Sequence, residues 1–102
     1  MKNLILIARA DSQQRLADTL RGLQQVSGFT FTPVEGHGAQ AAQDYSISAR
    51  DHVVGYTPQV RVDILLEAAH IKPVLAALSR PDVGLRGRCI YWITAVEQHG
   101  QL

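Results

Sequence analysis

The sequence predicts a small α+β domain, a ferredoxin-like sandwich with the element order β-α-β-β-α-β. Three observations predict it: four segments rich in β-branched and aromatic residues, two segments with apolar residues at helical spacing, and Gly or Pro between them. The chain has 102 residues, of which 46% are hydrophobic, so residues 1–102 form a single domain with one modest core.

The first predicted strand spans residues 3–9 and reads NLILIAR. It is apolar at both alternating positions, which is typical of a central, buried strand. Asp11 and Ser12 then suit the start of a helix. Gly28 is predicted to end this helix. The apolar stripe of the helix consists of Leu16, Leu20, Leu23 and Val26.

The second predicted strand spans residues 29–35, and Pro33 within it indicates an edge position or a bulge. Residues 39–55 follow without any sustained periodicity. A loop of that length in so small a domain is usually functional or disordered. We expect either a mobile arm that docks a partner or folds over a ligand, or a disordered insertion.

The third predicted strand spans residues 60–66, and the last spans residues 88–96. Between them, Pro73 fits only the first turn of a second helix. The apolar stripe of that helix consists of Ile71, Val74, Leu75 and Leu78. The chain then breaks at Pro81, Gly84 and Gly87.

Neither face of the first and last strands is polar. Leu4 and Leu6 alternate with Ile5 and Ile7, and the last strand has large apolar side chains at both parities. Two helices cover only one face of a four-stranded sheet, so several of these side chains would face water. A few hundred Å² of such surface, at about 25 cal/mol per Å², stores on the order of 10 kcal/mol for association. We therefore expect a homo-oligomer packed through the open sheet face.

Composition excludes several classes of function. Ten basic and nine acidic residues give a net charge of +1, without a basic stripe for nucleic acid or a cluster for a membrane surface. The longest apolar run, residues 4–8, is too short to insert into a membrane. With one cysteine, the chain has no internal disulfide, and a cytoplasmic location is expected. No nucleophile, Walker or zinc-hydrolase motif indicates an enzyme.

The turn before the last strand is a candidate anion site. Arg86 and Arg88 flank Gly87, and guanidinium groups suit bidentate binding of phosphate or carboxylate. The alternative is a solvated turn with surface arginines. A metal site is a second candidate, because His37, His52 and His99, with Cys89, could meet between subunits. The alternative there is that the histidines are surface groups and Cys89 is a packing residue.

Three short segments resemble the P-II signalling superfamily, which includes the CutA proteins. Residues 36–40, Gly-His-Gly-Ala-Gln, resemble the G-F-G-x-Q segment that precedes the long P-II loop. Residues 59–65 resemble its third strand, with Gln59 in place of a lysine. Residues 85–92 resemble its phosphate-binding turn, with Arg86 in place of an acidic residue. The chain is most similar to the small P-II-like group found beside heavy-metal efflux genes.

This resemblance implies a homotrimer with ligand clefts between subunits. It implies a non-enzymatic regulator that needs no cofactor and binds a small ligand. The ligand could be ATP, a nucleotide with fewer phosphates or another anion, and the absence of any nucleotide ligand also stays open. The ligand-binding residues implied are Gly36, His37, Gly38, Gln40, Arg86, Gly87 and Arg88. Residues 39–55 would bind a partner protein, such as a transporter or efflux component.

Two other functions stay open at this point. The first is a metal-binding or metal-responsive accessory protein linked to heavy-metal efflux, which would bind a divalent metal. The second is a purely structural trimer that docks on a larger assembly through its loop.

Overall fold

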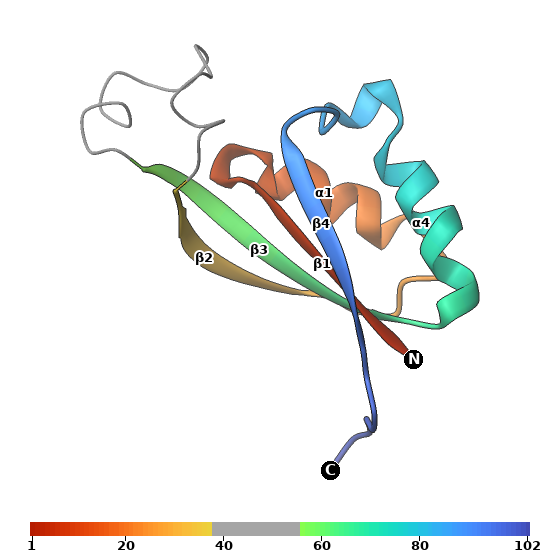
Figure 1. The fold of residues 1–102 in the computed structure, drawn as a ribbon. Coiled ribbons are helices and arrows are strands. Elements are labelled where there is room, and N and C mark those ends of the chain that lie inside the picture. The colour runs from red at the N-terminus through yellow and green to blue at the C-terminus, as the bar shows by residue number, and fades with distance from the viewer. Residues whose placement is uncertain (38–55) are drawn as a thin grey trace.

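The computed structural model describes residues 1–37 and 56–102 of the chain. The elements, in order, are β1 Lys2–Arg9, the 3-10 turn η1 Ala10–Ser12, α1 Gln13–Arg21, β2 Thr30–Gly36, β3 Thr57–Leu66, η2 Ala68–His70, α4 Ile71–Leu78, η3 Pro81–Val83 and β4 Cys89–Ala95. The strands pair antiparallel in the order β2-β3-β1-β4, and α1 and α4 lie on one face of the sheet (Figure 1). This small α+β domain is compatible with a ferredoxin-like sandwich.

The core lies between the sheet and the two helices. Alternate residues of β1 and β3 face it, because side chains on a strand point to opposite faces in turn. The helices contribute the apolar stripes that the sequence predicted. The core includes Leu4, Leu6, Val60, Val62, Ile64, Leu16, Leu20, Val74 and Leu78. The central position of β1, the edge position of β2 and the place of Pro73 in the first turn of α4 are confirmed.

The first helix is shorter than predicted. It ends at Arg21 with Gly22 as its C-terminal cap, so Gly28 does not end it. Leu23 and Val26 nevertheless pack against the core from the segment after the helix. Ser12 occupies the N-cap position of α1, as predicted, but makes no side-chain capping bond. Asp11 accepts a hydrogen bond from Arg9 Nη2 at 2.9 Å. The spacing of apolar residues therefore predicted correctly which side chains pack against the core, but it overestimated the length of the helix.

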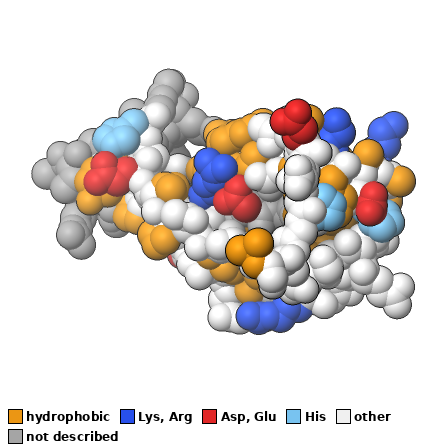
Figure 2. All heavy atoms as spheres, turned by 90° about the horizontal axis from the view of Figure 1, so that it is seen from below, with side chains coloured by type: hydrophobic (Ala, Val, Ile, Leu, Met, Phe, Trp, Pro, Cys, Tyr) orange, Lys and Arg blue, Asp and Glu red, His pale blue; other side chains and the backbone are white. Residues whose placement is uncertain are grey.

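The open face of the sheet is mixed, which corrects the expectation of an apolar face. Across β3 it carries Arg61 and Asp63, joined by a hydrogen bond of 3.0 Å from Arg61 Nη2 to Asp63 Oδ1. Asn3 Nδ2 also donates to Asp63, at 3.1 Å. The hydrogen bond from Arg61 lowers the pKa of Asp63. Seen from below, hydrophobic side chains lie among basic and acidic ones (Figure 2).

The exposed apolar side chains gather on β4 instead. Its residues from 90 to 93 have exposed fractions of 56%, 55%, 41% and 41%; they are Ile90, Tyr91, Trp92 and Ile93. Register places Trp92 beside Ile5 on the open face and Tyr91 beside Leu6 on the helix face. The prediction that large apolar side chains face water is therefore confirmed for this edge strand.

Candidate functional site

The candidate site is built on the turn between η3 and β4. Gly84 follows η3 in a left-handed conformation with φ of 77°. A Cβ there would lie 2.5 Å from Arg15 Nη1, so the missing side chain leaves room for that guanidinium. Arg15 Nη1 in turn donates to the carbonyl of Val83 at 3.3 Å. Helix α1 therefore anchors the start of the turn.

A buried residue holds the rest of the turn against the core, and the arginines of the turn face solvent. Leu85 is buried, and its carbonyl accepts a hydrogen bond of 2.9 Å from the Arg88 N–H. Gly87 takes the left-handed φ of 73° that closes this turn at little cost. Arg86 and Arg88 are both exposed. This arrangement suits electrostatic attraction of an anion, as the sequence predicted for these residues.

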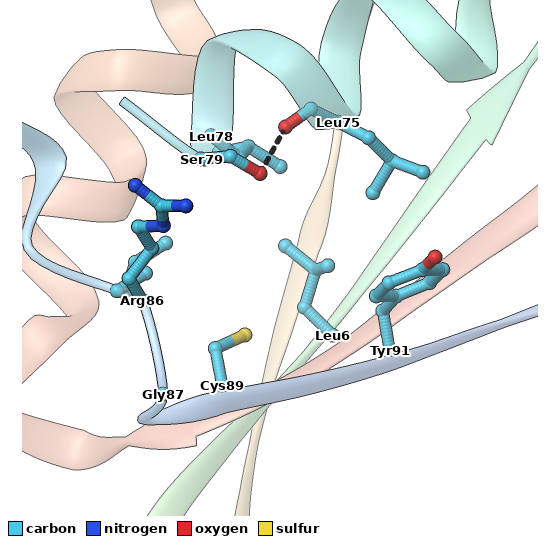
Figure 3. A pocket seen from close by; sticks show the side chains of 9 residues that line it. Leu6, Leu75, Leu78, Ser79, Arg86, Gly87, Cys89 and Tyr91 are labelled. Atoms are coloured by element: carbon cyan, nitrogen blue, oxygen red, sulfur yellow. Dashed lines mark hydrogen bonds between the residues drawn. The ribbon is translucent and has the colours of Figure 1, made fainter. Parts of the chain in front are cut away.

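A pocket of about 250 Å³ opens beside this turn, between α4 and β4 (Figure 3). Its walls are mainly apolar, and its polar groups come from the turn, the end of α4 and the hydroxyl of Tyr91 on β4. The lining residues are Leu6, Leu75, Leu78, Ser79, Leu85, Arg86, Gly87, Cys89 and Tyr91. The predicted residues Arg86, Gly87 and Cys89 are therefore brought together at one cavity.

Cys89 forms part of the pocket wall and packs against the core. Burial raises the pKa of its thiol to about 11. At neutral pH the sulfur is therefore protonated, whereas metal binding and nucleophilic attack both require the thiolate. The packing role that the sequence left open for Cys89 is the one that the structure supports.

The glycine segment lies at the end of β2. The side chain of Gln59 packs against Gly36 so closely that a Cβ at Gly36 would collide with it. His37 is exposed, with its Nε2 3.1 Å from Glu35 Oε2 and its ring 5.8 Å from that of Tyr56. Gly38 and Gln40, the other two predicted residues of the segment, lie outside the described residues.

The glycine segment and the arginine turn lie at the same end of the sheet but at its opposite edges. Gly36 pairs with Thr57 on β3, and Cys89 pairs with Ala8 on β1. In the order β2-β3-β1-β4 the two edges are three strand spacings apart, about 14 Å. A single phosphate group cannot contact both segments within one chain.

The predicted metal ligands do not meet within the described part of one chain. His37 lies at the β2 edge and Cys89 at the start of β4, whereas His99 follows the other end of β4. His52 lies outside the described residues. Among residues 1–37 and 56–102, no group of three or more His, Cys, Asp or Glu side chains could hold an ion.

Sequence reasoning missed several residues of this site. The sequence predicts Leu75 as part of the apolar stripe of the second helix and gives Tyr91 no site role, yet both line the pocket. No sequence signal pointed to Ser79 or to the anchoring role of Arg15. The role of Arg15 could be recognised only from the folded structure, because its hydrogen-bond partner Val83 lies 68 positions away in the sequence.

Neither described helix approaches the length and hydrophobicity needed to cross a bilayer, since α1 has nine residues and α4 has eight.

Comparisons with known proteins identify one family. The family model described as "Protein of unknown function (DUF3240)" matches residues 1–102. A crystal structure of a DUF3240 family protein from Shewanella baltica OS155 is similar, with 29% sequence identity and a TM-score of 0.77. The match covers 99% of this chain and 94% of that one. No curated protein matches the chain.

Proposed function

We propose, for a chain that belongs to the DUF3240 family, that it is a non-enzymatic regulatory protein of the P-II type. It binds a small anionic ligand, for which an adenine nucleotide is the first candidate, at clefts between the subunits of a homotrimer. Ligand binding changes how residues 39–55 engage a partner protein, such as a transporter or efflux component. The protein acts in the cytoplasm, without nucleic acid.

One observation carries the proposal: the two candidate ligand-binding segments occupy opposite edges of one sheet at the same end. The β2 edge of one subunit, placed beside the β4 edge of a second, would bring Gly36 close to Arg88. The exposed apolar side chains of β4 favour such contact, because burying them removes roughly 400 Å² from water. That is worth about 10 kcal/mol before the cost of association.

The mechanism follows from the position of the segments. Residues 39–55 begin three residues after Gly36, so an anion held at the glycine segment lies at the base of the loop. A ligand shifts a loop equilibrium only by its difference in affinity for the two loop states. A charged ligand next to the loop base can supply that difference through backbone N–H groups and guanidinium contacts.

Calorimetry with ATP, ADP and AMP tests the proposal, together with native mass spectrometry of protein taken directly from cells. We expect a trimer that retains or binds a nucleotide, with affinity about tenfold lower in the Arg88→Gln variant, since a charge-assisted contact is lost. Gly36→Ala, whose added Cβ displaces Gln59, should also weaken binding, whereas Gly28→Ala has open space and should not.

Absence of heat and of a thermal shift with all three nucleotides at millimolar concentration would exclude the nucleotide. Melting with Zn, Cu, Ni or Co addresses the metal-responsive alternative, because an ion that binds the folded state raises the melting temperature. The candidate ligands that the structure describes lie apart within one chain, so that alternative requires ligands from different subunits.

A further inference from the structure

The pocket lies between α4 and β4, which is an edge strand of the sheet. Leu75 and Leu78 form one wall, and Cys89 and Tyr91 form the other. Leu6 of β1 lies at the floor between them (Figure 3). Tyr91 is 55% exposed although it shares the helix face with the fully packed β1 residues. The cavity is complete in one chain.

The polar side chains that line the pocket are Arg86, Ser79 and Tyr91, and only Arg86 among the lining residues is charged. Arg86 projects from the turn opposite the Tyr91 ring (Figure 3). No hydrogen bond or ion pair joins its guanidinium to another side chain in residues 1–37 or 56–102. The Ser79 hydroxyl already donates to the carbonyl of Leu75 at 2.7 Å. An occupant would therefore meet apolar walls and a positive charge at one side.

The volume limits the size of an occupant. The cavity has a volume of about 250 Å³. Pockets for drug-sized ligands range from about 300 to 1,000 Å³. A single ring fits this space, and an intact nucleoside triphosphate does not. Larger groups would have to remain outside, along the turn.

The charge of the turn indicates the anionic group. Arg86 and Arg88 stand two residues apart on the same exposed turn, and no acidic side chain occurs between Asp82 and Glu97. A phosphomonoester carries nearly two negative charges at neutral pH, whereas a carboxylate carries one. Arg86 lines the pocket and Arg88 is exposed on the same turn, so the more highly charged phosphomonoester is attracted more strongly, and a guanidinium group binds its oxygens bidentately.

We infer that this pocket binds the ring of a compact aromatic phosphomonoester whose phosphate pairs with Arg86 at the turn. The inference rests on the proposed function, since it supplies the apolar half of the same ligand site. On this inference, Leu75, Cys89 and Tyr91 determine which ring the pocket accepts. The outer phosphates of a longer polyphosphate would lie outside the pocket.

The test is an NMR titration of the isotope-labelled full chain with phenyl phosphate and with inorganic phosphate. Phenyl phosphate should bind at least about tenfold more tightly, because only its ring gains burial. Arg86→Gln should weaken it about tenfold, with Arg80→Gln as control because Arg80 already pairs with Asp82. Equal binding of the two phosphates would overturn the inference.

Pocket-filling variants locate the bound ring. Leu75→Trp should abolish the preference for phenyl phosphate, whereas Ala76→Trp, one exposed position along α4, should leave it within about twofold. If Leu75→Trp does not fold, Tyr91→Ala removes a wall at an exposed site, with Ile90→Ala on the opposite face of β4 as control. Equal effects of a variant and its control would place the ring elsewhere.

The outcomes separate this inference from the proposed function. If phenyl phosphate binds as described while ATP, ADP and AMP are silent, the pocket stands and the nucleotide regulator falls. Nucleotide affinity could instead depend on Arg88 and Gly36 but be unchanged by Leu75→Trp and Tyr91→Ala. That result would support the proposed regulatory function and contradict the assignment of the pocket.

Discussion

Gln59 shows how one side chain changes the charge of the candidate site. Under the proposed P-II resemblance a lysine would be expected at this position, whereas this chain has an amide that packs against Gly36. The exposed arginines of the turn, Arg86 and Arg88, lie at the opposite, β4 edge of the sheet. For the proposed ligand, a neutral Gln59 therefore favours fewer phosphates over a polyphosphate that needs cations at both edges.

Cys89 provides a prediction at the residue scale. With its pKa raised from 9.0 to about 11, folded protein should react with iodoacetamide at pH 8 about a hundredfold more slowly than protein unfolded in urea. The rate in the folded state should rise up to pH 11. Equal folded and unfolded rates at pH 8 would contradict the assignment.

The raised pKa of Cys89 also determines how the stability of the folded protein changes with pH. The folded chain disfavours the thiolate, so Cys89 contributes its full share of stability below pH 9 and loses it as pH rises toward 11. A Cys89→Ala variant should show a smaller loss of stability over that interval than the natural chain.

At the scale of elements, the end of α1 at Gly22 does not depend on glycine. Gly22 caps the helix with φ of −78° and ψ of −8°, and its N–H bonds the carbonyls of Asp18 and Thr19. That conformation is right-handed and open to any residue. The helix therefore ends because the following segment turns back to pack Leu23 and Val26 on the core, not because glycine is required.

Gly22→Ala should consequently stabilise the protein by about 0.5–1 kcal/mol, because alanine restricts the unfolded chain and fits the native conformation. Its Cβ would meet the Thr19 carbonyl oxygen at 3.5 Å, an ordinary contact. Gly87→Ala is the matched opposite: at φ of 73° it should destabilise by about 1 kcal/mol. Urea unfolding measures both, and a destabilising Gly22→Ala would contradict this account.

For the whole molecule, the decisive feature is an edge strand with apolar side chains on both faces. An exposed edge of this kind pairs readily with another chain. The open sheet face beside it is divided, because the Arg61–Asp63 pair lies on β3 and the Arg61 guanidinium carbon is 6.0 Å from the centroid of the Trp92 ring on β4. We therefore expect subunit contact to centre on β4 more than on the face as a whole.

Ile93→Lys should dissociate the proposed trimer into chains of 11.2 kDa, because a lysine ammonium would have to be buried in the contact. Ala76→Lys, on the exposed side of α4, adds the same charge away from β4 and should leave the trimer intact. Analytical ultracentrifugation at micromolar concentration distinguishes them. A monomeric natural chain, or equal behaviour of the two variants, would argue against association through β4.

The sequence predicted the local features of this protein well, because local features depend on local chemistry. Segments rich in β-branched and aromatic residues identified all four strands, helical spacing identified both helices, and Pro33 indicated the edge strand. Arg86 and Gly87 were predicted from an Arg/Gly turn, and both line the cavity. The end of α1 and the start of β3 at Thr57 were missed, since pairing and packing with distant residues set those boundaries.

The sequence by itself determined the element order, the apolar core and the chemistry of the arginine turn, because spacing and side-chain type fix which surfaces avoid water. Only the tertiary structure decided that the glycine segment and the arginine turn stand at opposite edges of the sheet. It also decided that Leu75 and Tyr91 face each other across a cavity. The strand order and the position of α4 relative to β4 arise from packing between residues far apart in the sequence, and residue spacing does not predict that packing.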